Sequence, residues 1–205
     1  MTAPKFITFE GTEGVGKTTT IDGFCRKLDS RGIAYIRTRE PGGSPLAETL
    51  RKILLDNKTN ISDDTELLMM FTARADHLHQ TILPALADGK WVVCDRFFDS
   101  TVAYQGFGRF GGDSHQLAKI SSLIEAFVPK KPDLTFWLDL DPVIGIQRAG
   151  KRSVVDRFES EDLAFFERTY QGFLYQHQKN PNRIKRINAN GSPADVLSRL
   201  LPFLT

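Results

Sequence analysis

The sequence has little cysteine, no hydrophobic run of membrane-spanning length and almost no net charge. Only two of its 205 residues are cysteine, and Cys25 and Cys94 lie too far apart for a C-x-x-C motif, which argues against a fold built on disulfides or paired thiol ligands. The amino-terminal residues also lack the hydrophobic segment of a secretion signal. We therefore expect a protein of the reducing cytoplasm that has no membrane partner.

The charges of the two signs nearly cancel. Lysine and arginine number 27 and aspartate and glutamate 25, which gives a formal net charge of +2 at pH 7. Because binding to the phosphates of nucleic acid needs a basic surface, we expect no nucleic acid partner and expect any basic site to be local. Hydrophobic residues make up 40% of the chain, which is long enough for one domain with a full core, over residues 1–205.

Residues 11–18 have the sequence GTEGVGKT, which fits the pattern G-x-x-x-x-G-K-[ST] of a phosphate-binding loop. The apolar segment 6–9 before it predicts a buried strand, and residues 19–28 after it predict a helix, as the motif requires. In such loops N–H groups converge on an anion, the lysine reaches the β- and γ-phosphates, and the hydroxyl of the last residue holds Mg²⁺. We expect a nucleotide to contact these residues: Gly11, Thr12, Glu13, Gly14, Val15, Gly16, Lys17, Thr18 and Thr19.

Short apolar runs alternate with segments of helical periodicity along the rest of the chain. Further strands are predicted at 33–36, 91–94, 134–138 and 184–187. Helices are predicted at 46–55, 65–87, 114–127 and 161–178, with others beginning near Pro142 and Pro193 and a kink at Pro84. This alternation predicts an α/β fold of the P-loop NTPase type, a three-layer fold in which helices cover both faces of a five-stranded parallel sheet.

Polar groups follow three of the predicted strands, at the sheet edge where ligands of parallel sheets bind. They are the phosphate-binding loop, the 39–43 loop and the pair Asp95-Arg96. Asp95 would assist Mg²⁺, directly or through water, and Arg96 could hold an acceptor phosphate, although a surface ion pair would also explain it. Arg51 is either a second phosphate ligand or a solvated helix residue.

Two features of the helical segments leave alternatives open. Phe71 and Arg74 are three residues apart and share a helix face, so they could stack on and hydrogen-bond a base, or Phe71 could simply lie in the core with Arg74 in water. His77 and His79 are two apart and point to different faces of a helix, which argues against a metal site.

A guanine-reading N-K-x-D motif is missing after the predicted strands, which favours a small-molecule kinase over a GTPase.

Together these residues resemble the thymidylate kinase family, of the bacterial type with a basic lid. The motifs that carry the resemblance follow one another along nearly the whole chain, at 9–20, 39–43, 71–74, 77, 95–97, 100, 103–106, 138–139 and 156–159. The resemblance implies transfer of the γ-phosphoryl group of ATP, bound with Mg²⁺, to dTMP by a homodimer. Phe97 departs from the tyrosine or histidine that often follows Asp-Arg in the family, so we expect no polar role there.

The resemblance also implies roles for residues of the acceptor site. Phe71 would stack on thymine, Arg74 would hydrogen-bond its O4, and the base edge would meet Thr101 and Gln105. Arg96 and Arg51 would hold the dTMP phosphate. Glu13 would approach either the deoxyribose 3′-hydroxyl or the loop side of the substrate. The remaining substrate-binding residues that we expect are Glu10, Ser100, Pro41 and Tyr104, the last two near the sugar.

A basic segment at residues 148–159 would form the lid. The phosphate-binding loop has no basic residue at its variable positions, so the cation that stabilises the transferred group must come from elsewhere. We expect Arg152 to supply it, with Arg148 second; a solvated basic loop is the alternative. The expected catalytic residues are Lys17, Arg96, Arg152, Asp95 and Glu13. Rival functions are a kinase for another nucleoside monophosphate and a nucleotide-binding regulatory module, but the latter does not need an intact Lys17, Thr18 and Asp95.

Overall fold

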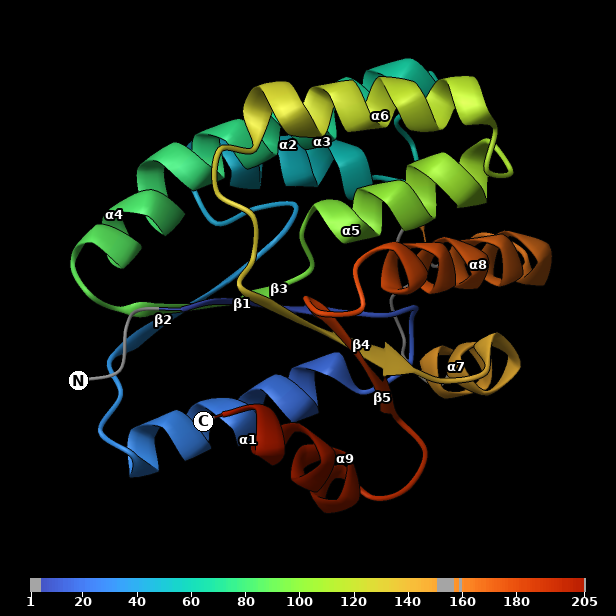
Figure 1. Cartoon of the computed structure of the whole chain (residues 1–205). Helices are drawn as coiled ribbons and strands as arrows, with labels where there is room; N and C mark the ends of the chain where they lie inside the picture. Colours follow the sequence, from blue (N-terminus) through green and yellow to red (C-terminus); the bar gives the residue numbers. More distant parts are fainter. Residues whose placement is uncertain (1–4, 151–156, 159, 205) are drawn as a thin grey trace.

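The strands form one parallel sheet. The computed structural model describes residues 5–150, 157–158 and 160–204, and within them five strands are ordered β2-β3-β1-β4-β5 (Figure 1). This confirms the predicted five-stranded parallel sheet. The strands are β1 (Phe6–Glu10), β2 (Tyr35–Arg39), β3 (Trp91–Asp95), β4 (Leu134–Asp139) and β5 (Ile184–Asn188).

The central strand β1 leads directly into the phosphate-binding loop at the carboxyl edge of the sheet. It is buried along its whole length because its residues are apolar or internally hydrogen-bonded on both faces. It pairs with β3 on one side and β4 on the other, and Phe9 stands opposite both Asp95 and Phe136. Since the strands are parallel, the segments that follow β1 and β3 leave the sheet side by side. The phosphate-binding loop and Arg96 are therefore neighbours.

Helices cover both faces of the sheet, as predicted. Figure 1 shows α1 (Lys17–Ser30) and α9 (Pro193–Leu200) on one face. The other face carries α2 (Pro45–Leu55), α3 (Asp63–His77), α4 (Leu83–Ala87), α5 (Phe98–Thr101), α6 (Ser114–Phe127) and α8 (Leu163–Lys179). The short α7 (Pro142–Ala149) follows β4, and the 3₁₀ turn η3 (Leu201–Phe203) follows α9. No helix in these ranges is long and apolar enough to cross a bilayer.

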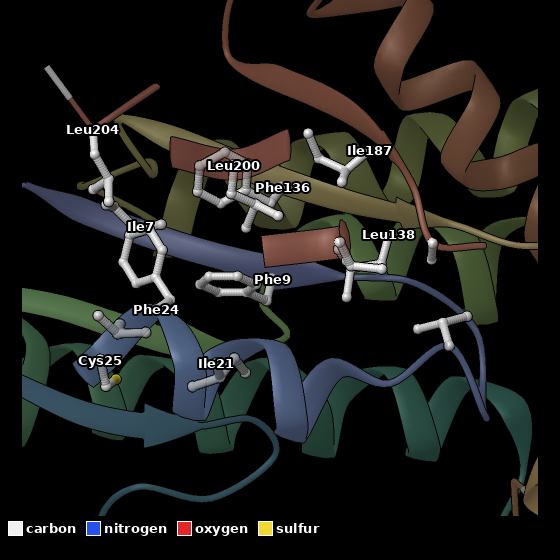
Figure 2. Close-up of a cluster of buried hydrophobic side chains, with 14 of the residues drawn as sticks. Ile7, Phe9, Ile21, Phe24, Cys25, Phe136, Leu138, Ile187, Leu200 and Leu204 are labelled. Carbon is white, nitrogen blue, oxygen red and sulfur yellow. The ribbon is translucent and has the colours of Figure 1, made fainter. Parts of the chain in front are cut away.

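The core beneath the sheet holds α1, and with it the phosphate-binding loop, in place. Phe9 of β1, Phe24 of α1 and Phe136 of β4 pack as a group, with ring centroids 5.2–5.8 Å apart. Figure 2 shows these side chains between the sheet and the helices α1 and α9, with Leu200 closing the cluster from α9. Because each ring is fully buried, tilting α1 would expose aromatic surface, which makes the position of the loop rigid.

One predicted helix differs from the structure, and one helical segment was not predicted. The helix predicted at 65–87 is interrupted by a π-helical turn, η1 (Leu78–Ile82), just before Pro84, which cannot donate a backbone hydrogen bond to the preceding turn. The glycine-rich segment after Asp99, for which no element was predicted, is helical and continues α5 as the π-helix η2 (Val102–Arg109). Its glycines allow close packing, since a Cβ at Gly108 would lie 2.6 Å from the ring of Phe165.

Two boundaries also shift. Strand β2 begins at Tyr35 rather than at Ile33, because the Ile33 N–H donates to Leu28 O in the turn that ends α1, where Gly32 has a φ of 65°. Arg148, predicted to lie in a basic loop, belongs to the last turn of α7.

Candidate functional site

A cavity of about 640 Å³ opens at the carboxyl edge of the sheet. It is bounded by the phosphate-binding loop, the loop after β2, α3, the segment after β3 and η2. Most of the predicted site residues line it, although they come from distant parts of the sequence. They are Glu13, Gly14, Val15, Gly16, Lys17, Thr18, Thr19, Pro41, Arg51, Arg74, Asp95, Arg96, Ser100, Thr101, Tyr104 and Gln105.

The phosphate-binding loop depends on glycine at Gly14. This residue has a φ of 70°, and a Cβ placed on it would lie 1.9 Å from the carbonyl oxygen of Gly145 in α7. Only glycine therefore permits both the left-handed backbone and the close approach of α7. Gly11 and Thr12, also predicted to contact a nucleotide, do not line the cavity.

Lys17 lies at the first turn of α1 with its ammonium inside the loop. Its Nζ donates hydrogen bonds to the carbonyl oxygens of Gly11 and Thr12, both at 3.1 Å. Burial lowers the pKa of Lys17, and the nearby Arg96 lowers it further, against the opposing effect of the Glu13 and Asp95 carboxylates. An anion in the loop would supply the counter-charge that restores a stable ammonium.

Arg96 has an unusual backbone conformation and a fully engaged side chain. Its φ of 68° lies in the left-handed region, which non-glycine residues rarely occupy. Its Nη1 donates to Gly11 O at 2.8 Å and Ser100 Oγ at 3.1 Å, and its Nη2 donates to Tyr104 Oη at 3.0 Å and to a Glu13 carboxylate oxygen. The guanidinium thus bridges the phosphate-binding loop and η2, in the middle of the cavity wall.

Glu10 does not line the cavity, so the prediction that it contacts substrate does not fit the geometry. Its side chain is fully buried, accepts the Phe97 N–H at 2.7 Å, and bonds to Ser100 Oγ. Burial, with a contribution from Asp99, raises the pKa of Glu10 from 4.5 to about 8. Because Phe97 follows Arg96 directly, Glu10 instead holds the strained turn that presents Arg96.

Asp95 and Thr18 are suited to bind Mg²⁺. Both line the cavity, Asp95 at the end of β3 and Thr18 exposed at the start of α1. Oδ1 of Asp95 is buried, and within the described part of the chain it has no hydrogen-bond partner. A buried carboxylate oxygen without a partner is costly unless a cation or its water ligands satisfy it. The residues present therefore fit the metal that the loop motif implies.

The guanidinium of Arg74 is fixed by hydrogen bonds from two of its nitrogens, and its third nitrogen has no partner within the described residues. Its Nε donates to Glu40 Oε2 at 2.7 Å and its Nη2 to Thr101 Oγ1 at 3.0 Å. Its guanidinium carbon lies 5.0 Å from the ring centroid of Phe71 and 5.3 Å from that of Phe97. The remaining nitrogen, Nη1, is buried and has no partner among the residues that the structure describes. It is an available donor for a ligand carbonyl.

Met70, rather than Phe71, accompanies Arg74 in the cavity wall. Residues three and four apart both share a helix face with Arg74, and the structure places the four-apart residue Met70 at the cavity. The ring of Phe71 is buried in the core between α3 and the sheet, 3% exposed. Phe71 lies against the Arg74 guanidinium and is not among the residues that line the cavity, and its stacking on a base stays a prediction.

The other predicted acceptor residues are positioned by backbone contacts and a buried carboxylate. Arg51 of α2 donates from Nη1 to Pro41 O at 2.8 Å, which joins the helix to the loop after β2. Gln105 of η2 donates from Nε2 to Glu66 Oε1 at 2.6 Å. Burial raises the pKa of Tyr104, so its hydroxyl stays protonated and donates to Glu13.

Of the basic residues predicted for the lid, the structure describes Arg148 and Arg157. Arg152 lies outside the described residues, as does Lys151. Arg148 is exposed on α7 and does not line the cavity. Arg157 pairs with Glu66 at 2.5 Å and donates to Leu54 O at 2.9 Å, so its charge is used to anchor this segment to α2 and α3.

Sequence reasoning missed Glu40, Met70 and Glu66. Glu40 stood in a recognised loop but was given no role, and its buried pair with Arg74 joins residues 34 apart in sequence. Met70 and Glu66 lie on α3, four and eight residues before Arg74, so helical periodicity alone could have placed them on its face. Glu66 lies in the acidic first turn of α3, directly before the apolar residues 67–71, so nothing in the local sequence marked it as buried.

The chain is similar to known proteins over almost its whole length. The family model described as Thymidylate kinase matches residues 9–200. A thymidylate kinase of Psychrobacter sp. is 62% identical over 200 residues, covering 98% of this chain and 96% of that protein. One of Acinetobacter baylyi is 48% identical over 201 residues, covering 97% and 98%. The crystal structure of the thymidylate kinase from Ehrlichia chaffeensis matches with a TM-score of 0.78 and 30% identity, covering 99% of each chain.

Proposed function

The chain belongs to the thymidylate kinase family and phosphorylates dTMP to dTDP, and we propose that ATP bound with Mg²⁺ on the phosphate-binding loop is the donor. The observation that carries the proposal is that Lys17 and Thr18 line the same cavity as Arg74 and Gln105. A triphosphate on the loop and a base beside Arg74 would face each other across this cavity. Arg96 would lie between them.

The base of the acceptor nucleotide binds to Nη1 of Arg74, the guanidinium nitrogen that has no hydrogen-bond partner within the described residues. This nitrogen lies in a guanidinium fixed by Glu40 and Thr101, so it can donate to the O4 carbonyl of thymine without reorganising. Gln105 meets the neighbouring edge of the base, and Met70 provides apolar contact where a ring was expected. Pro41 and Tyr104 enclose the sugar.

The phosphate of dTMP binds at Arg96, with Arg51 beside it. Arg96 already donates to Glu13 and Tyr104 through one nitrogen, so an incoming phosphate would share the guanidinium with the loop carboxylate. Charge-assisted bonds of this kind are strong and directional, and they would aim a phosphate oxygen at the donor. Glu13 thereby keeps Arg96 in place before the substrate arrives.

Phosphoryl transfer then requires alignment and charge rather than a general base. An oxygen of the dTMP phosphate, already anionic, attacks the γ-phosphorus; the bond to the β–γ bridging oxygen breaks, and ADP leaves with that electron pair. Lys17 stabilises the charge that develops on the bridging oxygen. Thr18 and Asp95 would hold Mg²⁺, which neutralises the β- and γ-phosphates when bound.

Further parts of the proposal extend beyond the described residues. The chain acts as one kinase domain over residues 1–205, and Arg152 supplies an additional cation from the lid. The active form is a homodimer. We place the reaction in the cytoplasm, because Cys25 and Cys94 are buried free thiols, as a reducing compartment would keep them.

An acceptor panel tests the proposed function. The protein is incubated with ATP and Mg²⁺ and each of dTMP, dUMP, UMP, dCMP, AMP and GMP, and nucleoside diphosphates are separated by chromatography. The proposal predicts dTMP as the best acceptor and formation of dTDP and ADP in equal amounts. Preference for AMP or dCMP, or ADP formation without dTDP, would overturn it.

A further inference from the structure

The amide of Gln105 has a fixed orientation. Its Nε2 lies 2.6 Å from Oε1 of Glu66, and both side chains are buried, 2% and 1% exposed. A carboxylate only accepts hydrogen bonds, so the NH₂ end of the amide must face Glu66. The carbonyl oxygen of Gln105 is then the end left for the cavity that this residue lines.

Glu66 is itself held as an acceptor by two guanidiniums. Its Oε2 receives a hydrogen bond from Arg157 Nη2 at 2.5 Å and one from Arg109 Nη2 at 3.4 Å. Arg109 is tied in turn to Glu161 on the far side. Both carboxylate oxygens of Glu66 are therefore occupied as acceptors, Oε1 by the Gln105 amide and Oε2 by the two guanidiniums, and this geometry holds the amide in one orientation.

The cavity therefore presents a donor and an acceptor in a defined order. Arg74 offers Nη1–H, and Gln105 offers its carbonyl oxygen. The edge of thymine or uracil has the opposite pattern, an O4 acceptor next to an N3–H donor. Cytosine has an N4 amine donor next to an N3 acceptor, so it would set donor against donor and acceptor against acceptor.

We infer that Glu66 is a positioning residue that fixes the Gln105 amide and thereby makes the acceptor site select a thymine or uracil base over cytosine. The inference rests on the proposed function, because it concerns the base of the acceptor nucleotide. Glu66 acts only through Gln105 and touches no substrate. Removing its charge lets the amide rotate, which weakens dTMP binding and removes the penalty against dCMP.

The test is the ratio of kcat/KM for dTMP to that for dCMP, measured in a double-mutant cycle. We expect Glu66→Gln to lower this ratio about ten- to a hundredfold, the range for one misaligned buried hydrogen bond. Gln105→Leu should lower it similarly, and adding Glu66→Gln to Gln105→Leu should lower it no further. Glu161→Gln is the matched control, because it changes a carboxylate of the same ion cluster that does not touch Gln105.

A purely structural role for Glu66 would reduce kcat/KM for both acceptors alike, and an unchanged ratio in Glu66→Gln would overturn the inference. If the wild-type protein did not phosphorylate dTMP at all, the proposed function itself would fail. A second experiment uses the wild-type protein, so its result does not depend on whether a variant folds. In NMR spectra of isotope-labelled Gln105, dTMP should shift the carbonyl carbon and leave the NH₂ group in place, whereas a displaced NH₂ group would contradict the inference.

Discussion

Nε of Arg74 lies 2.7 Å from Oε2 of Glu40, in an ion pair whose side chains are 3% and 4% exposed. His77 donates from Nδ1 to the other oxygen of Glu40 at 3.0 Å, because a carboxylate cannot donate in return. The arginine that we propose to recognise the base is thus fixed by the loop after β2, an element far from it in sequence. The orientation of the Arg74 guanidinium is therefore set by contacts within the folded protein.

Glu40→Gln tests the importance of this pair. The variant leaves the Arg74 charge buried without its counter-charge, so we expect a loss of about 3 kcal/mol in the free energy of unfolding and a raised KM for dTMP. Urea unfolding and steady-state kinetics measure both. Asp22→Asn breaks the exposed pair with Arg37 and should cost less than about 1 kcal/mol. Equal losses in the two variants would contradict the prediction.

Lys17→Met tests the phosphate-binding loop. Methionine keeps the length of the side chain and loses the charge that faces the leaving ADP, so kcat should fall about a hundredfold or more. Turnover with saturating dTMP and ATP is the measurement. Lys52→Met, on the exposed side of α2, is the matched control and should leave turnover unchanged. Near-normal turnover of a folded Lys17→Met protein would exclude the proposed role.

Arg96→Ala tests the acceptor phosphate site. Because Arg96 is proposed to bind and align the dTMP phosphate, its loss should raise the KM for dTMP by about tenfold or more, and that for ATP far less, while kcat also falls. Arg37→Ala, which removes an exposed arginine, should alter neither constant. If the KM values for dTMP and ATP rose equally in Arg96→Ala, the residue would not be specific to the acceptor.

The buried Glu10 predicts a pH dependence of stability. Its carboxyl titrates near 4.5 when unfolded and, through burial and the nearby Asp99, at about 8 when folded. Between these values the folded protein retains a proton that the unfolded chain loses, so the free energy of unfolding falls as the pH rises from about 5 to about 8. Glu10→Gln does not titrate and should lack this part of the fall. Urea unfolding of both proteins across that range is the measurement; parallel pH profiles would contradict the predicted pKa.

The donor half of the proposed site is predicted from contiguous motifs. The phosphate-binding loop and the Asp95-Arg96 pair each lie in one short stretch, and the strand pattern places both at the same edge of the sheet. The order of the strands, and the segment 102–109, could not be predicted in the same way. Its glycines carry no helical signal in the sequence, and in the structure they allow close packing, of α6 at Gly106 and of α8 at Gly108.

The acceptor half depends on contacts between segments far apart in sequence. Phe71 and Met70 both satisfy the helical spacing to Arg74, and the structure places Met70 at the cavity wall and the ring of Phe71 in the core. Arg157 looked like a lid cation, but the buried carboxylate of Glu66 binds it, over a sequence separation of 91. Periodicity indicates which residues share a face, and packing decides which of them reaches the ligand.

The central claim is that one cavity binds the donor on the phosphate-binding loop and the acceptor on Arg96 and Arg74, facing each other. The most direct test is calorimetric binding of a bisubstrate compound in which adenosine and thymidine are joined through their phosphates. We predict that it binds at least about a hundredfold more tightly than dTMP, because both halves are engaged at once. Lys17→Met and Arg96→Ala should each remove much of that gain. Binding no tighter than dTMP alone, or simultaneous binding of two molecules per chain, would contradict the account.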